Sequence, residues 1–192
     1  MAMSVPTKDI IIQKTTKLFA LQGYEGFSMR TLAKEIPLAQ SVLYHYFPDK
    51  NALLRAMFDT LNTQLGEKRA KLPSEKSASE MLRQRIIFQL DNAEAIVAVL
   101  KFYIAYRKTF PKFKGGYVPD KTSLHIEEVL QYGMLTGEFS MNNLEQDARV
   151  ITHAINGFLL EYFPDIPRGH EREDLVHTIH SFLLRALMKG GE

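Results

Sequence analysis

The stretch GYEGFSMRTLAKEIPLAQSVLYHYF, residues 23–47, decides the fold of the N-terminal part of this chain. Ser28 is a residue type that caps helix N-termini, and the apolar spacing after it predicts a short helix over 29–35. Pro37 ends that helix, because a proline disfavours helical backbone in the residue before it. A second short helix is expected over 40–46. Two short helices joined by a tight turn form a helix-turn-helix.

Four consecutive ring-bearing side chains close this stretch: Tyr44, His45, Tyr46 and Phe47. A helix places rings on one face only when they are three or four residues apart, so these rings point in different directions. Leu43 and Phe47 are expected to pack inside, with part of Tyr46. Tyr44 and His45 are expected to face outward, where a hydroxyl and an imidazole can hydrogen-bond a partner.

The rest of the chain is also predicted to be helical, because it lacks the sustained period-two alternation of strands. Apolar residues recur at helical spacing, which predicts a first helix over about 8–22 with Thr7 as its N-cap and another that runs from Asp49 towards Pro73. The segment 78–110 is expected to form one helix, or two helices joined near Asn92. Three more helices are predicted over 121–136, 143–163 and 171–189. The fold class is therefore all-α. A small three-helix unit over 1–48 contains the helix-turn-helix, and a larger helical domain follows over 49–192.

Composition narrows the class of protein. The 192 residues include no cysteine, which excludes disulfides and cysteine-ligated metals and suits a reducing interior, so we expect a cytoplasmic protein. The N-terminus has no uninterrupted apolar region typical of a signal peptide, and no apolar run approaches the roughly 20 residues of a membrane-spanning helix. Residues 1–55 carry seven basic and four acidic side chains, a mild positive excess compatible with a polyanion.

Motifs of catalysis are missing from the sequence. We find no nucleophile elbow, P-loop, Gly-rich dinucleotide turn or metalloprotease helix, so we do not expect an enzyme or a cofactor. His177 and His180 could bind a metal together with Glu173, but such histidines are more often surface or interface residues, and we expect no metal site.

Residues 10–55 as a whole resemble the DNA-binding region of the TetR family of bacterial transcriptional regulators. The resemblance is carried, in order and without gaps, by Leu18-Phe19, Gly23-Tyr24, Leu32-Ala33, Leu43-Tyr44, Phe47 and Lys50. It implies that residues 1–48 bind double-stranded DNA and that the second short helix enters the major groove. It also implies that residues 49–192 bind a small-molecule effector and form a homodimer.

Four residues are assigned to base edges by this resemblance. Gln40 can pair with adenine through two hydrogen bonds, Ser41 can donate or accept, and the Val42 methyl groups can contact a thymine methyl group. Arg30 matches a family position that can reach a base, with guanine as its best partner.

Four more residues are assigned to the DNA backbone. Ser28 and the helix N-terminus that it caps, the Tyr44 hydroxyl and Lys50 would contact phosphates. His45 matches a position that often touches the backbone in the family.

The turn departs from the family pattern. Ile36-Pro37-Leu38-Ala39 stands where the family usually has Ala-Gly-Val-Ser, so the second helix loses the hydroxyl of its N-cap. Alanine in place of serine at an N-cap costs about 1 kcal/mol. We therefore predict a looser recognition helix that orders fully on DNA.

The last two helices are apolar on more than one face, which indicates burial on two sides, and we favour a partner subunit as one of them. Two copies would then form a four-helix interface that sets the spacing of the recognition helices. The interface residues predicted from this pattern are Ile155, Phe158, Tyr162, Leu175, Ile179, Phe182 and Ala186.

Effector contacts are expected at polar or ring-bearing positions on otherwise apolar helices. The candidates are Phe88, Phe102, Tyr106, His125, Met134, His153 and Asn156. Their aromatic and methionine content favours a hydrophobic, planar effector.

The favoured function is a repressor that a small molecule releases from a near-palindromic operator. Two alternatives remain open: a DNA-binding architectural or cell-division protein without an effector, and a small-molecule-binding helical protein or enzyme whose helix-turn-helix has lost its function.

Overall fold

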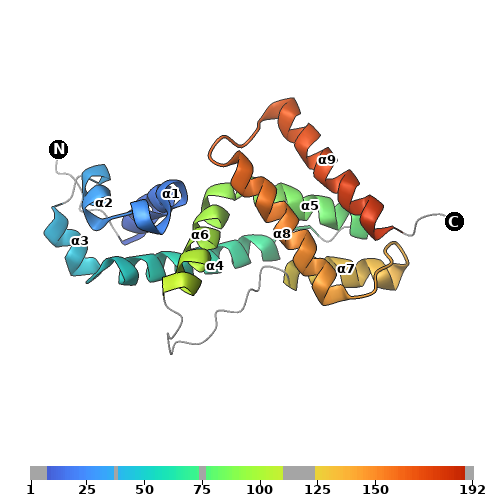
Figure 1. Cartoon of the computed structure of the whole chain (residues 1–192), viewed down its shortest axis with the longest axis horizontal. Helices are drawn as coiled ribbons and strands as arrows, with labels where there is room; N and C mark the ends of the chain where they lie inside the picture. The colour runs from blue at the N-terminus through green and yellow to red at the C-terminus, as the bar shows by residue number, and fades with distance from the viewer. Residues whose placement is uncertain (1–7, 37–38, 74–76, 110–123, 189–192) are drawn as a thin grey trace. The chain divides into compact units, whose positions relative to one another are not determined.

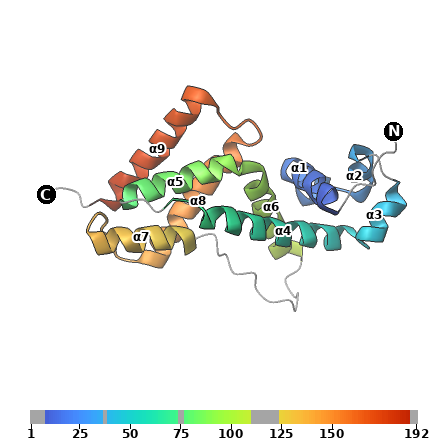
Figure 2. The same ribbon diagram turned by 180° about the vertical axis from the view of Figure 1, so that it is seen from behind.

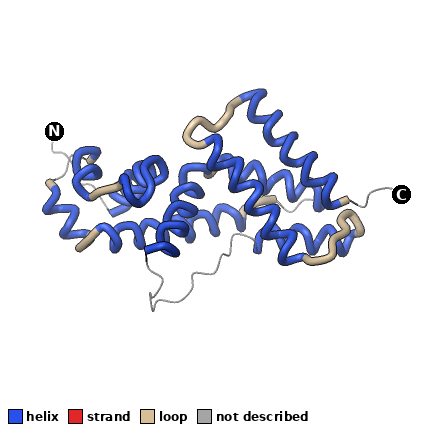
Figure 3. The backbone as a smooth tube through the Cα atoms, viewed as in Figure 1, coloured by secondary structure: helices blue, strands red, loops and turns tan. Residues whose placement is uncertain are grey.

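The computed structural model describes residues 8–36, 39–73, 77–109 and 124–188 of the 192-residue chain. Within these ranges every regular element is an α-helix, which confirms the predicted all-α fold class (Figure 3). Thr7 and the turn residues Pro37 and Leu38 lie outside the described residues.

The chain divides into two compact units. The first comprises Met1–Ala70 and Glu94–Lys114, and the second comprises Lys71–Ala93 and Gly115–Glu192. Helix α6, Ala93–Thr109, therefore groups with the N-terminal helices. The predicted functional division at residue 48 stays a prediction, because compactness does not identify what a unit binds.

The helix-turn-helix forms as the sequence predicts. Helix α2 spans Met29–Glu35 and begins at Ser28, whose Oγ accepts a hydrogen bond from the Thr31 N–H at 3.0 Å. Helix α3 spans Gln40–Tyr46 (Figure 1). Its N-cap, Ala39, offers no side-chain hydrogen bond, which confirms the missing hydroxyl cap.

Helix α1 spans Lys8–Gly26 but is interrupted at Gly23, where φ is 68°. This left-handed backbone is accessible to glycine at little cost, so the helix turns at the end that the sequence predicts. Phe27 follows the interruption and packs edge-on against Phe19, with ring centroids 6.0 Å apart. Both side chains are buried, as are the inward-facing Leu32 and Leu43 of the helix-turn-helix.

Helices α4 and α6 complete the first unit. Helix α4 spans Lys50–Ala70, and the Asp49 carboxylate caps it by accepting a hydrogen bond from the Ala52 N–H at 2.8 Å. From α6, Lys101 Nζ donates to the carbonyl oxygens of Ala20 (2.5 Å) and Leu21 (3.3 Å). Lysine thus satisfies carbonyls near the end of α1 and ties α6 to that helix.

The second unit contains α5 (Ala78–Asp91), α7 (Leu124–Thr136), α8 (Leu144–Tyr162) and α9 (Gly169–Leu187). Helix α5 packs against the other three, and α7 lies beside it in both views (Figures 1 and 2). The predicted helix over 78–110 is thus two helices, joined at Asn92 as anticipated.

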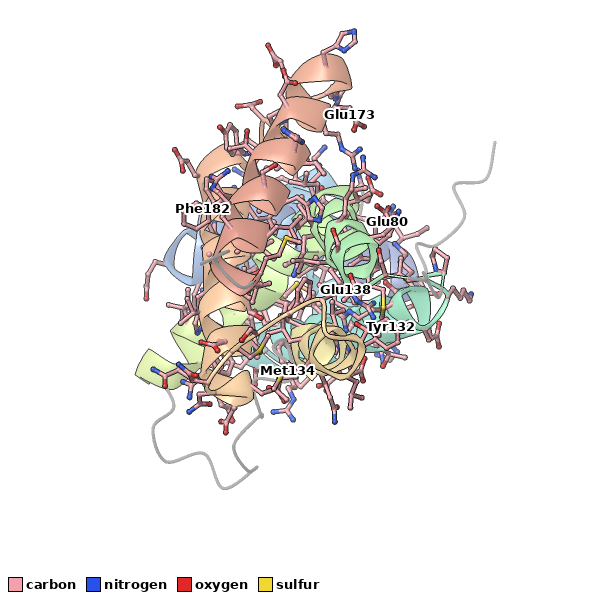
Figure 4. All side chains as sticks on the ribbon, turned by 90° about the vertical axis from the view of Figure 1, so that its right-hand side faces the viewer. Glu80, Tyr132, Met134, Glu138, Glu173 and Phe182 are labelled. Atoms are coloured by element: carbon pink, nitrogen blue, oxygen red, sulfur yellow. The ribbon has the colours of Figure 1, made fainter. Side chains whose placement is uncertain are left out.

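Polar contacts hold α5 in place. The Glu138 carboxylate, in the turn after α7, accepts hydrogen bonds from the backbone N–H groups of Ala78 (2.9 Å) and Ser79 (3.2 Å) (Figure 4). These N–H groups have no partner within α5 because they belong to its first turn. The hydrogen bonds stabilise the ionised carboxylate and lower the pKa of Glu138 from its usual value of 4.5.

Glu138→Gln is expected to lower the free energy of unfolding by about 1 kcal/mol at neutral pH, the usual scale for a lost helix cap. A lowered folded-state pKa means that the unfolded chain binds the proton more readily, so the stabilisation is present above the ordinary pKa. It is lost as the pH falls through the lowered folded-state value. Urea denaturation at neutral pH and in acid checks this, because the gap between wild type and variant should close on acidification. A gap independent of pH would contradict the charged cap.

Candidate nucleic-acid interface

Helix α3 presents most of its side chains to solvent. Within the helix only Leu43 is buried, and Phe47 directly after it is buried as well. Gln40 and Ser41 are exposed, Val42 is half-buried, and His45 is exposed. The tyrosines expose 45% (Tyr44) and 37% (Tyr46) of their surface. Two apolar anchors thus hold the helix while its outer face stays open to a partner.

Two further predicted DNA contacts belong to α2, which packs against α3, and to its N-cap. Arg30 is exposed in the first turn of α2. Ser28 is half-buried, and its Oγ lies 2.7 Å from Thr31 Oγ1 in addition to capping the helix. The structure therefore gives Ser28 a structural role, and its predicted phosphate contact stays a prediction.

Lys50 is engaged with its own unit. Its Nζ donates to the Tyr24 carbonyl oxygen at 2.5 Å and lies 4.0 Å from the centroid of the Tyr24 ring. The Tyr24 hydroxyl in turn donates to Asn51 Oδ1 at 3.0 Å. Partial burial lowers the pKa of Lys50, and the nearby Glu25 carboxylate partly offsets this. These contacts link the start of α4 to the residue after the α1 interruption.

Lys50→Met is expected to weaken DNA binding to a similar extent on all sequences and to flatten the salt dependence by about one unit per bound subunit, because each subunit would lose its predicted phosphate contact. It should also destabilise the free protein by about 1 kcal/mol, since the hydrogen bond and the cation–π contact disappear. Titrations at several salt concentrations measure the first effect and urea denaturation the second. Lys17→Met, an exposed α1 variant, is the control. An unchanged salt slope would leave Lys50 only its structural role.

The predicted effector residues occupy different environments. In the first unit, Phe102 is buried and stacks between Phe58 (4.6 Å) and Tyr106 (5.8 Å between ring centroids). In the second unit, Phe88 and Asn156 are buried.

The remaining three candidates lie nearer the surface of the second unit. His125 Nδ1 is 3.9 Å from a Glu128 carboxylate oxygen. Met134 lies on α7 (Figure 4) and is 44% exposed, and His153 is exposed on α8. Met134 and His153 therefore sit on outer faces rather than among buried side chains. Periodicity alone did not distinguish the two sides of these helices.

The predicted interface residues also divide into two groups. Ile155, Leu175 and Ile179 are buried in the described chain itself, so they pack its own core. The others are exposed: Phe158, Tyr162, Phe182 and Ala186. Phe182 exposes 60% of its surface and lies on the opposite side of α9 from Glu80 of α5 (Figure 4). The outward apolar face is completed on α8 by Val150, which is 61% exposed.

No cluster of three or more potential metal ligands occurs in the described parts of the chain. His180 Nε2 lies 2.8 Å from the Ser79 carbonyl oxygen, and His177 Nε2 lies 3.4 Å from Ser181 Oγ. None of the helices in the described ranges combines the length and apolarity needed to cross a membrane.

Comparison with known proteins places this geometry in a family. The family model described as bacterial regulatory proteins, tetR family, matches residues 11–57, which contain the helix-turn-helix and the start of α4. This chain is a transcriptional regulator of the TetR family. Its helix-turn-helix is the family's DNA-binding element.

Curated relatives of this TetR-family regulator share low identity over long stretches. The regulator QacR of Staphylococcus aureus is 22% identical over 197 residues, covering 95% of this chain and 98% of QacR. The uncharacterized regulator YhgD of Bacillus subtilis is 25% identical over 129 residues, 67% of this chain, and the match spans 62% of YhgD. The negative regulator IcaR of the S. aureus biofilm operon icaADBC is 23% identical over 132 residues, covering 65% of this chain and 68% of IcaR.

Solved structures share the fold. PfmR, a TetR-family regulator from Thermus thermophilus, superposes with a TM-score of 0.68 at 23% identity, covering 91% of this chain and 97% of PfmR. A TetR-family regulatory protein from Rhodococcus RHA1 gives a TM-score of 0.69 at 15% identity, covering 98% and 100% of the two chains. At these identities the likeness concerns the fold alone.

Proposed function

We propose that this TetR-family regulator is a homodimeric repressor that binds a near-palindromic operator through α3 and leaves it when a small molecule binds. The observation that carries the proposal is the outer face of α3, which is open to solvent while Leu43 and Phe47 anchor the helix. The relative named as a negative regulator, IcaR, favours repression over activation.

The side chains of the α2–α3 region suit both parts of DNA recognition. Gln40 and Ser41, at the N-terminal end of α3, can read base edges, and Arg30 extends the reading to a neighbouring base. Tyr44 and His45, further along the same helix, can hydrogen-bond phosphates. One seven-residue helix would then contact the base edges and the DNA backbone and also pack against the core of its own unit.

The exposed apolar faces of α8 and α9 support a dimer. A two-fold axis would bring each face against its copy and hold the two α3 helices about 34–36 Å apart, one turn of DNA. Repeated half-sites at that spacing are what such a dimer reads.

Release by an effector requires a difference in affinity between two conformations. A small molecule removes the protein from DNA only if it binds more tightly to a form in which the α3 spacing no longer fits. Within the first unit, the hydrogen bonds from Lys101 would pass a movement of α6 directly to α1.

Selection of bound duplexes from a random pool tests the function, followed by titration of the winning duplex at two salt concentrations. We expect an inverted repeat and a steep fall of affinity with salt, because several phosphates are contacted in each half-site. Many dispersed sites without a repeat would favour an architectural protein. Absence of binding even at low salt would overturn the proposal.

A further inference from the structure

Among the described residues of the second unit, four polar side-chain atoms are enclosed without a hydrogen-bond partner. They are Arg85 Nη1 and Gln89 Oε1 on α5, and Thr152 Oγ1 and Asn156 Oδ1 on α8. Thr152 exposes only 1% of its surface and Asn156 only 5%. Each enclosed, unpaired polar atom costs on the order of 1–3 kcal/mol, so native proteins keep few of them without a reason.

The positions of the four side chains form a pattern. Arg85 and Gln89 are four residues apart on α5, and Thr152 and Asn156 are four residues apart on α8, so each pair shares one face of its helix. The two helices pack directly against each other. Arg85 also lies near Glu128 of α7. We name these four residues, after the two helices that carry them, the α5–α8 polar cluster.

The cluster is separate from the polar contacts between α5 and α9. Arg83 of α5 pairs with Glu173 of α9 at 3.3 Å (Glu173 in Figure 4). Asp91 of α5 pairs with Arg172 of α9 at 2.5 Å. Arg85 lies about 200° around the helix from Arg83, so it points away from the α9 side. The described ion pairs with α9 therefore do not involve Arg85.

Arg85 is the only permanently charged member of the cluster, and its charge is poorly compensated. Burial lowers its pKa, and the nearby Glu128 carboxylate offsets this only in part. Among the described residues Arg85 forms no ion pair, and the Glu128 side chain is itself 66% exposed. A partly buried guanidinium without an anion is costly, and an anion brought to it would be bound strongly.

We infer that the four side chains of the α5–α8 polar cluster converge on one site, that this site binds the polar end of the effector, and that the effector is an amphipathic carboxylic acid. This inference rests on the proposed function, because it names the chemical class of the small molecule. A carboxylate matches the planar fork of Arg85, and the Thr152 hydroxyl can donate a further hydrogen bond. The amides of Gln89 and Asn156 can present either a donor or an acceptor to the same group.

The neighbours of the cluster on the same helices are apolar. Ile86 and Phe88 on α5 and Ile155 and Leu159 on α8 are buried. Such surroundings suit the hydrocarbon part of the ligand, and they strengthen a hydrogen-bonded ion pair by excluding water.

Matched probes test the ligand class on the full-length protein without DNA. The probes are hexanoate, decanoate and naphthoate, with the corresponding alcohols as uncharged controls, all below their micelle concentrations. We expect at least one carboxylate to raise the melting temperature and to give saturable binding in calorimetry, because a ligand of the folded state alone stabilises it. The alcohols should produce a much smaller shift.

Two variants locate the site. Arg85→Met should bind the carboxylate about 30-fold more weakly or worse, the scale of a lost buried charge pair, while the free protein melts at the same or a higher temperature. Thr152→Val, which keeps the shape and removes the hydroxyl, should weaken binding several-fold. Arg83→Met is the control on the same helix, and it should bind like wild type because, among the described residues, its side chain pairs with Glu80 and Glu173 outside the cluster.

Three results would overturn the inference. The first is an equal shift of the melting temperature by carboxylates and alcohols, and the second is an unchanged carboxylate affinity in Arg85→Met. The third is no binding of any carboxylate, which would mean that ordered water alone hydrogen-bonds the polar atoms of the cluster. The operator titration without ligand is a separate readout. A protein that binds its operator and fails these tests retains the proposed function and loses only the ligand class.

Discussion

Replacement of Phe182 by aspartate is expected to convert the proposed dimer to a monomer and to weaken operator binding by orders of magnitude. Phe182 is 60% exposed on α9, so the substitution leaves the core of the chain intact. In a two-fold interface each copy contributes its own residue 182, so two unpaired carboxylates would lose their water on association. Analytical ultracentrifugation measures the oligomeric state, and circular dichroism checks that the helices remain.

Loss of the dimer should also cause loss of DNA binding. A monomer contacts one half-site and forfeits the phosphate and base contacts of the other. The matched control is Leu135→Asp, which places the same charge at an 81% exposed apolar residue of α7. This control should remain dimeric. A Phe182→Asp protein that stays dimeric would show that the subunits meet elsewhere.

Gln40→Glu is the second change with a large expected effect. The substitution preserves the shape of an exposed side chain at the first position of α3, so folding should be unaffected. On DNA, a carboxylate replaces an amide that can donate and accept, and it is repelled by the surrounding phosphates. A bidentate contact is worth about 1–3 kcal/mol, and a dimer loses two, so operator affinity should fall about 100-fold or more.

Fluorescence anisotropy with the selected duplex measures this loss. Gln64→Glu makes the same change at an exposed position of α4 and should leave binding close to wild type. A Gln40→Glu protein with wild-type affinity and an unchanged base preference would mean that the first turn of α3 does not face the bases.

Helix boundaries could be predicted from the sequence because their causes are short-range. The Ser28 hydroxyl caps a helix that begins at the next residue, and the Asp49 carboxylate caps α4 three residues ahead. Gly23 and Gly137 take positive φ values of 68° and 78° at the predicted helix ends. Such signals need only neighbouring residues, so a linear pattern contains them.

Site residues were predictable only where resemblance supplied their positions. The helix-turn-helix residues follow from a constellation over 10–55. By contrast, the α5–α8 polar cluster was missed apart from Asn156. The sequence feature that could have revealed this cluster is a pair of polar residues spaced four apart within an otherwise apolar helix. It occurs in the segments RQRIIFQ and THAIN. This spacing also occurs on solvent-exposed faces, so it does not by itself indicate burial.

The sequence alone determined the all-α class, the helix-turn-helix and its uncapped recognition helix, because these depend on caps, breakers and periodicity within a few residues. Only the tertiary structure decided which apolar stripe of α8 and α9 enters the chain's own core, and that Phe182 stays outside while Ile155 and Ile179 are buried. It alone joined Glu138 to Ala78 and Lys101 to Ala20, which are 60 and 81 residues apart. A periodic pattern shows that a face will be buried, whereas its partner depends on packing between segments distant in the chain.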